Sequence, residues 1–448
     1  MTEENNSMPQ QKHAASQSAR IHGQKRKIRR RLYVESRSAE KYSLTFIKWV
    51  AIAAVTGLVG GTIGGLFHMS VNAANEFRSE NRYVLFCMPL AGVLIAWLYH
   101  VCKYDKDGGT NLVISSIRTK GHIPLRMAPL IFVSTVLTHL TGGSAGREGA
   151  ALQLGGSIGS SIGELFRIKK EDAGVAVLCG MSALFSALFG TPLTATFFAM
   201  EVVSVGVIYY AALVPCLTAS LTAFGVSLFM KAEPTRYDIS GHVPDVGAIS
   251  LLQVAGLAAV CAVVSIIFCV MMKFSHTKLE QLIKNKYLRA AAGGAVIVLL
   301  TLLLRTTDYN GAGTQVIERA IYEGKSMPYD FIMKMIFTAV TIGAGYKGGE
   351  IVPTMFIGST LGCTVAPLVG LDPCFGAAVG LAALFCSVVN CPIAAIFLSL
   401  ELFGSGGVIL FAAACGVSYM LSGYYGLYSS QKIVYSKLHT RYINRRTK

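Results

Sequence analysis

Two long stretches of the chain are nearly without charge, and they constrain its fold more than any other feature. Residues 173–230 contain one formally charged side chain, Glu201, and residues 373–431 contain one, Glu401. Over the whole 448-residue chain only 14% of residues are charged, against roughly 25% in a soluble domain. Such stretches are typical of lipid-embedded helices, so the sequence predicts an all-α polytopic membrane protein.

Apolar runs close to the length of a membrane-spanning helix recur along the chain. They cover residues 44–70, 83–103, 125–141, 173–200, 205–230, 250–273, 289–304 and 374–430. Gly and Pro interrupt several of these runs. Because lipid cannot hydrogen-bond to a broken backbone, the interruptions are expected to face protein or a water-filled pathway.

The net charge of +16 is concentrated near the two ends, notably in the run Lys25–Arg31. Positive charge beside membrane spans favours the cytoplasmic side, so both termini are predicted to be cytoplasmic in a plasma-membrane protein. We interpret the basic run as an orientation signal or a contact with anionic lipid, and expect no nucleic-acid partner. A cleavable signal peptide is not expected either, because the basic run precedes a span much longer than a signal peptide's apolar segment.

The predicted organisation has four parts. A basic disordered cytoplasmic tail (1–42) precedes a first membrane half (43–230) and a second membrane half (231–440), and a short cytoplasmic tail (441–448) follows. The eleven cysteines lack the spacing of metal ligands and are expected to be small core residues. No metal or cofactor is expected.

The two membrane halves are related by internal duplication. At an offset of 200 residues, "GMSALFSALFGTPLTATFFAME" (180–201) aligns with "GLAALFCSVVNCPIAAIFLSLE" (380–401), with 8 identities in 22 positions. The shared positions include a proline and the carboxylates Glu201 and Glu401. Since an isolated carboxylate at membrane depth needs donors or water, we expect both to be structural groups at a helix end or a dimer contact.

Glycine motifs upstream of these segments also pair between the halves. "GREGA" (146–150) matches "GEIVP" (349–353), and each motif leads into a helix. Broken helices of inverted repeats that meet near the membrane centre point their amides and partial positive charge at one place. The sequence therefore predicts an anion site between the two motifs.

These motifs resemble those of the CLC chloride channels and proton-coupled anion exchangers. "GREGA" is similar to the family's G[KR]EGP motif and "GGEIVP" (348–353) to GxFxP, while "GGTNL" (108–112) stands where GSGIP is expected. "GLYSS" (426–430) resembles the late segment that carries the pore tyrosine. The resemblance implies a CLC-type inverted-repeat helical bundle with broken helices, assembled as a homodimer with one pathway in each subunit.

The resemblance also implies roles for individual residues. Glu148 would be the gating glutamate, whose carboxylate competes with the permeant anion and withdraws when protonated. The anion-binding residues would be Gly109, Thr110, Asn111, Gly146, Arg147, Gly149, Glu350, Ile351, Val352 and Tyr428. The transported partners would be a halide anion and protons.

Departures from the family pattern concern the substrate. Val202 replaces the inner glutamate of proton-exchanging chloride members, Glu350 adds a carboxylate beside the anion path, and "GTN" replaces GSG. These changes resemble the fluoride-exporting branch, whereas Thr110 and Tyr428 are compatible with a chloride-type site. Fluoride is basic enough to bond strongly to a carboxyl, hydroxyl or amide donor. The sequence leaves both chloride and fluoride as candidate substrates.

Three functional classes follow from the residues and the resemblance. The first is a halide/proton antiporter that uses Glu148 and Glu350, and the second is a passive, voltage- or pH-gated anion channel, which Val202 favours. The third is a membrane enzyme, but the sequence lacks a nucleophile elbow and a convergent set of catalytic groups. We interpret His139 as a hydrogen-bonded core residue, so an enzyme is not expected.

Overall fold

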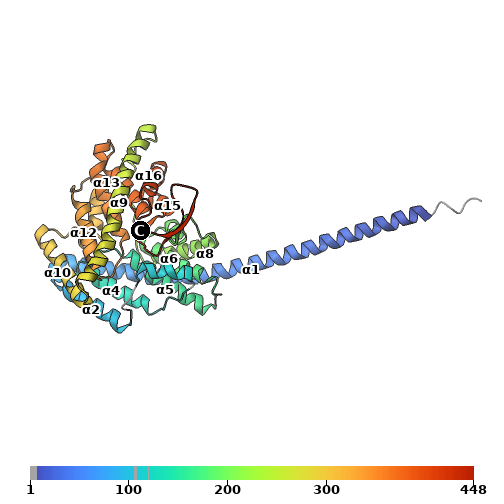
Figure 1. Cartoon of the computed structure of the whole chain (residues 1–448), viewed down its shortest axis with the longest axis horizontal. Helices are drawn as coiled ribbons and strands as arrows, with labels where there is room; N and C mark the ends of the chain where they lie inside the picture. Colours follow the sequence, from blue (N-terminus) through green and yellow to red (C-terminus); the bar gives the residue numbers. More distant parts are fainter. Residues whose placement is uncertain (1–7, 105–107, 120) are drawn as a thin grey trace, which may run out of the picture. The chain divides into compact units, whose positions relative to one another are not determined.

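The computed structural model describes residues 8–104, 108–119 and 121–448, with side chains described from residue 40 onwards. The chain divides into two compact units, residues 1–51 and residues 52–448. In the described ranges it forms sixteen α-helices and three 3-10 helices (Figure 1). The α-helices are α1 Met8–Glu80, α2 Met88–Val101, α3 Thr110–Thr119, α4 Met127–Leu140, α5 Glu148–Leu165, α6 Ala173–Phe189, α7 Pro192–Glu201, α8 Leu213–Phe229, α9 Ala248–Leu282, α10 Lys286–Leu304, α11 Thr314–Tyr322, α12 Asp330–Gly343, α13 Ile351–Val365, α14 Pro373–Val389, α15 Pro392–Phe403 and α16 Val408–Leu421. The 3-10 helices are η1 Arg82–Cys87, η2 Tyr210–Ala212 and η3 Ala366–Val369.

The first unit consists of helical backbone from residue 8 onwards, as the N-terminal part of α1. The disordered tail that the composition of residues 1–42 predicts stays a prediction. The first seven residues of that tail lie outside the described residues. The other boundaries of the four predicted parts stay predictions.

Six helices among the described residues are long and apolar enough to cross a membrane. They are Glu40–Glu80, Arg82–Val101, Tyr210–Phe229, Ala248–Leu282, Lys286–Leu304 and Ile351–Val369. The remaining apolar helices have 10–17 residues, too few to span roughly 30 Å of hydrocarbon. The expected all-α membrane fold is therefore confirmed, with the long apolar run at 374–430 resolved into α14, α15 and α16.

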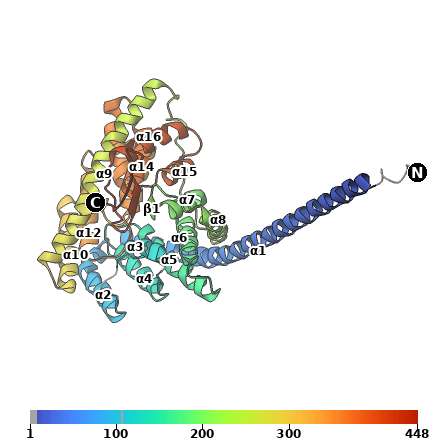
Figure 2. The same ribbon diagram turned by 45° about the vertical axis from the view of Figure 1, so that its right-hand side comes forward.

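The duplicated halves repeat the same helix packing. In the first half α5 packs along α6, and in the second half α13 packs along α14. A side chain at Gly155 would overlap the Gly180 carbonyl oxygen, and one at Gly358 would overlap the Gly380 carbonyl oxygen. Each pair of helices is thus so close that only glycine fits at the crossing. Around these pairs, α10 lies against α2 (Figure 1) and α9 against α14 and α16 (Figure 2).

We expect Gly380→Ala to lower the thermal unfolding midpoint in detergent, because its methyl group would overlap the α13 backbone. Overpacking of this kind costs about 1–3 kcal/mol. Gly416→Ala in α16 is the matched control, since a side chain there meets no atom within 4 Å. Scanning fluorimetry of the two variants and the parent protein checks this. An equal loss in both variants would contradict the packing argument.

The two isolated carboxylates cap helices of the opposite half. Glu401, in α15, accepts hydrogen bonds at Oε1 from Leu193 N (2.9 Å) and at Oε2 from Thr194 N (2.8 Å) and Thr194 Oγ1 (2.6 Å). Glu201, in α7, accepts from Ile393 N (3.4 Å) and Ala394 N (3.1 Å). These donors lie in the first turns of α7 and α15, where helices leave amides unpaired and attract negative charge. The prediction of carboxylates at helix ends is confirmed.

A small sheet lies at the end of the chain, which the all-α expectation did not include. Strand β2 (Lys432–Tyr435) pairs in parallel with β1 (Ser204–Val205) and antiparallel with β3 (Tyr442–Arg446). The registers align Ser204 with Lys432, and Lys432 with Arg446. Since β1 directly follows α7, the C-terminal segment is bonded to the first membrane half.

Candidate functional site

The two glycine motifs meet through a single backbone bridge. Gly146 N donates to Gly349 O (2.7 Å) and Gly349 N donates to Gly146 O (2.6 Å), as an isolated antiparallel pair. The Cβ of a side chain at Gly149 would stand 2.8 Å from Gly349 Cα, so the two backbones touch. The predicted pairing of "GREGA" with "GGEIVP" is thus present in the structure.

This bridge brings two helix N-termini together. Helix α5 begins at Glu148 after Arg147, and α13 begins at Ile351 after Glu350, and neither N-terminus has a side-chain cap. Ala151 N donates the first hydrogen bond within α5, and Thr354 N donates the first within α13. The amides before them have no partner within the helix, so both ends present donors and partial positive charge to an anion.

The Glu148 carboxyl lies at this junction. The side chain is 1% exposed, and its carboxyl lies against the backbone amides of Arg147, Glu148 and Val352. Neither oxygen makes a hydrogen bond of regular geometry within the described part of the chain. The nearest cation is Arg147, with Nε 3.8 Å from Glu148 Oε1. A buried carboxyl without well-formed hydrogen bonds is costly, so it is a group that can readily exchange a proton or leave its position.

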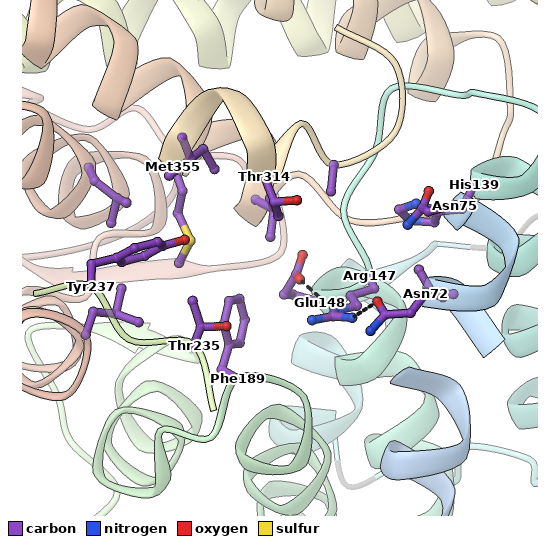
Figure 3. Close-up of a pocket in the computed structure, with 16 residues that line it drawn as sticks. Asn72, Asn75, His139, Arg147, Glu148, Phe189, Thr235, Tyr237, Thr314 and Met355 are labelled. Carbon is purple, nitrogen blue, oxygen red and sulfur yellow. Dashed lines mark hydrogen bonds and ion pairs between the residues drawn. The ribbon is translucent and has the colours of Figure 1, made fainter. Parts of the chain in front are cut away.

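Arg147 connects three helices beside Glu148. Its Nη1 donates to Asn72 Oδ1 of α1 (3.1 Å) and its Nη2 to the Leu188 carbonyl of α6 (3.5 Å). Figure 3 shows its guanidinium between Asn72 and Glu148. The guanidinium therefore holds the turn before α5 in place while keeping positive charge next to the carboxyl.

A cavity of about 90 Å³ opens at Glu148, with room for several water molecules. Thr235, Tyr237 and Met355 lie across it from Asn72 and Arg147 (Figure 3). Its polar lining comes from four segments far apart in the sequence: Asn72, Asn75, His139, Arg147, Glu148, Thr235, Tyr237 and Thr314. We refer to it as the Glu148 cavity. Apart from Arg147 and Glu148, sequence reasoning assigned none of these residues to the site, because no motif marks them.

His139 is fully buried, as a core residue would be. The Gly146 backbone lies beside its ring as a hydrogen-bond partner, although neither ring nitrogen makes a bond of regular geometry among the described residues. The ring also lines the Glu148 cavity, where water or an anion can supply a further partner.

The segments with the predicted hydroxyl donors also come together. Asn111 Oδ1 accepts a hydrogen bond from Ser430 N (2.8 Å), which ties the start of α3 to the segment after Tyr428. Thr110 Oγ1 donates to the Gly149 carbonyl (3.3 Å), so α3 also contacts α5. Gly109 has a left-handed φ of 57°, which lets the chain turn into α3. Asn111 thus positions the tyrosine segment in addition to its expected place near the anion.

Tyr428 is buried, and its hydroxyl has no hydrogen-bond partner in the described part of the chain. It lies close enough to Glu148 and Glu350 for both carboxyls to act on it electrostatically. Its carbonyl accepts a hydrogen bond from Thr447 Oγ1 (2.7 Å), so the residue directly after β3 holds the Tyr428 backbone in place. An unpaired buried hydroxyl is a donor available to an anion.

The C-terminal end of α7 continues into an apolar residue, as the sequence indicated. Val202 is fully buried, and its carbonyl accepts a hydrogen bond from Gln431 Nε2 (2.9 Å). The preceding Glu201 turns to α15 as a helix cap. Neither residue offers a free carboxyl at this end of α7.

Comparisons with known proteins agree on one family. Residues 91–423 match the sequence profile described as voltage gated chloride channel. A chloride/fluoride channel protein of Pseudomonas syringae pv. tomato is 35% identical over 399 residues, 88% of each chain. An H(+)/Cl(−) exchange transporter of Vibrio parahaemolyticus is 24% identical over 80% of this chain and 83% of its own length.

Solved structures show the same fold. The crystal structure of a CLC-type fluoride/proton antiporter has a TM-score of 0.83 at 32% identity and covers 87% of this chain and 98% of that one. A slow cyanobacterial Cl−/H+ antiporter has a TM-score of 0.72 at 20% identity, with 84% and 94% covered. The second match supports the fold alone.

Proposed function

Because the chain belongs to the voltage gated chloride channel family, also called CLC, we propose that it exchanges fluoride for protons across the membrane, with Glu148 as the gating carboxyl. Members of this family are transporters rather than enzymes, so the proposal is for a transport activity. In this proposal an anion binds between the N-termini of α5 and α13 and displaces the Glu148 carboxylate. The displaced carboxylate then takes up a proton, so anion movement and proton movement are linked.

The observation that carries the proposal is the Glu148 carboxyl itself. It is buried, it lies against backbone amides of both helix N-termini without a hydrogen bond of regular geometry to any of them, and it stands at the first turn of α5 beside the Glu148 cavity. An ionised carboxylate and a permeant anion compete for the same unpaired amides. Protonation removes that competition, which is the physical basis of coupling.

The presence of Glu350 at the N-terminus of α13 favours fluoride over chloride as the substrate. Glu350 is the residue before α13, half-buried and close to Tyr428. A carboxyl there repels an anion when ionised but donates a strong hydrogen bond when protonated, and small, basic fluoride gains most from that bond. Both comparisons above 30% identity carry fluoride in their descriptions.

The test is ion flux in reconstituted liposomes. Vesicles loaded with fluoride or with chloride are compared for efflux, and a proton gradient is then imposed across the same vesicles. The proposal expects faster fluoride efflux and uphill fluoride movement driven by the proton gradient. Fluoride that only ever runs down its own gradient would overturn proton coupling, and faster chloride efflux would overturn the choice of halide.

A passive anion channel is the second candidate, and Val202 is the observation that favours it. The buried valine and the Gln431 bond to its carbonyl leave no free carboxyl at the C-terminal end of α7. Coupled exchange therefore needs another proton route, for which Glu350 is the nearest candidate. The same liposome experiment separates the two functions, since a channel cannot drive fluoride uphill.

Removing the Tyr428 hydroxyl tests its part in anion binding. We expect Tyr428→Phe to weaken halide binding by about 1.5–3 kcal/mol, the range for a hydrogen bond to a charged group. Stability should change little, because the hydroxyl has no partner among the described residues. Tyr424→Phe is the matched control, since its hydroxyl bonds Ser436 Oγ (2.7 Å) instead. Halide titration by calorimetry measures both, and equal losses would contradict the assignment.

Assembly and orientation complete the proposal. We propose a homodimer in the plasma membrane with both termini in the cytoplasm. Lys448 and Tyr425 line one groove together with Lys278, near the end of α9. This end of α9 is therefore expected on the same side of the membrane as the C-terminus. Mass photometry in detergent tests the dimer, and protease protection of terminal epitope tags in intact cells tests the orientation.

A further inference from the structure

We propose that His242, Asp372 and Cys374 form a binding site for a borderline-soft divalent cation such as Zn²⁺, and that a cation bound there slows transport. One ligand atom from each residue lies within 4.8 Å of the others. Nitrogen, oxygen and sulfur together are the donor set that Zn²⁺ accepts, whereas Mg²⁺ and Ca²⁺ require oxygen. Asp372 and Cys374 are close in the sequence, but His242 lies in a distant segment, so no local spacing of metal ligands marks this group.

The carboxylate of this group is already held in position. Asp372 Oδ1 accepts hydrogen bonds from Cys374 N (2.9 Å) and Phe375 N (3.2 Å), which cap the start of α14. His242 Nδ1 lies 3.1 Å from the same oxygen. A cation would replace the proton between the imidazole and the carboxylate, and the Cys374 thiolate would complete three protein ligands. Water would fill the open position, as in zinc sites with three protein ligands.

Access to the site is suitable for a cation from solution. The His242 and Asp372 side chains are 40% and 41% exposed, while Cys374 is buried behind them. The exposed pair admits the ion, and the buried thiol adds the soft ligand that separates this group from ordinary surface pairs. The pair His122–Glu164, at 2.6 Å, is an exposed histidine–carboxylate pair that is not part of such a three-ligand group within the described residues.

If α9 spans the membrane, as its length and composition allow, the site lies on the opposite side from the C-terminus. Helix α9 has 35 residues, a length of roughly 50 Å, and His242 precedes its first residue by a short turn. The far end of α9 meets Tyr425 and Lys448. With the C-terminus in the cytoplasm, the cation would therefore bind from outside the cell.

The same loop forms part of the Glu148 cavity. Thr235 and Tyr237 line that cavity (Figure 3), and their amides donate to Phe189 O (3.2 Å) and Leu402 O (2.8 Å). His242 is only five residues further along. A cation that joins His242 to the start of α14 would restrain this loop and so hinder ion exchange at the cavity. This second part of the inference rests on the proposed transport function, whereas cation binding does not.

Binding is tested first, without transport. Zn²⁺ added to the purified protein should raise its thermal unfolding midpoint, because a ligand of the folded state stabilises it. His242→Ala and Cys374→Ser should each weaken the apparent affinity by about tenfold or more, while His122→Ala leaves it unchanged. Mg²⁺ should have no effect. A Zn²⁺ shift that persists at full size in both site variants would overturn the site.

Transport is tested second, in liposomes with Zn²⁺ added on either side. Efflux through the parent protein should slow, and the Zn²⁺ concentration for half inhibition should rise about tenfold in His242→Ala, because His242 itself does not line the Glu148 cavity. A Zn²⁺ shift in melting with no effect on efflux would overturn the control of transport. Loss of halide efflux in the parent protein without Zn²⁺ would instead count against the proposed function.

Discussion

Glu148→Gln is expected to abolish proton-driven uphill fluoride movement while passive fluoride flux continues. The amide has the shape of the carboxyl but cannot carry the proton, and it does not compete as an anion for the amides of α5 and α13. The pH dependence of flux should be lost with the coupling. Fluoride flux in liposomes, recorded at a series of pH values with and without a proton gradient, measures both effects.

The matched control for this variant is Glu164→Gln on the same helix. Glu164 is 62% exposed and pairs with His122, so its neutralisation should leave coupling and pH dependence unchanged. If Glu148→Gln still moves fluoride uphill under a proton gradient, the carboxyl at the junction of the two helices is not the coupling group.

Glu350→Ala is expected to lower fluoride efflux about tenfold or more and chloride efflux much less. This range corresponds to the loss of a strong hydrogen bond to a charged species, which is worth about 1.5–3 kcal/mol. Stability should hold, because the Glu350 side chain does not cap α13 and the backbone bond from Thr354 N to Glu350 O (3.0 Å) remains. Efflux measured in parallel from fluoride-loaded and chloride-loaded liposomes gives the ratio of the fluoride rate to the chloride rate for the variant and the parent protein.

Glu350→Gln separates charge from hydrogen bonding. The amide can still donate to fluoride but cannot exchange a proton, so efflux should fall less than in the alanine variant while coupling is weakened. A similar loss for both halides, together with a lower melting temperature, would show that Glu350 is a structural residue.

The membrane fold and its duplication could be predicted from the sequence because both depend on repeated local patterns. Glu201 and Glu401 were identified as helix-end groups from their isolation in apolar surroundings, and the structure confirmed this with bonds to α7 and α15. The pairing of the two glycine motifs was likewise predictable, since glycine and a following helix are local features. The Gly146–Gly349 bridge realises that pairing.

The walls of the Glu148 cavity could not be predicted in the same way. Asn72, His139, Tyr237 and Thr314 come from separate segments, and each has an ordinary local sequence. Their common position depends on how the two halves pack, which a single sequence without a matching motif does not specify. The strands at the C-terminus are a second example, because β2 is short and its partner β1 has only two residues.

The exchange of helix caps between the halves has a consequence for synthesis. Helix α7 is made long before Glu401 leaves the ribosome, so the amides of Leu193 and Thr194 must wait for a carboxylate from the second half. Glu201 in turn waits for Ile393 and Ala394. Neither half can reach its final structure alone, and a gene cut between them should yield a working protein only when both pieces are inserted in the same membrane.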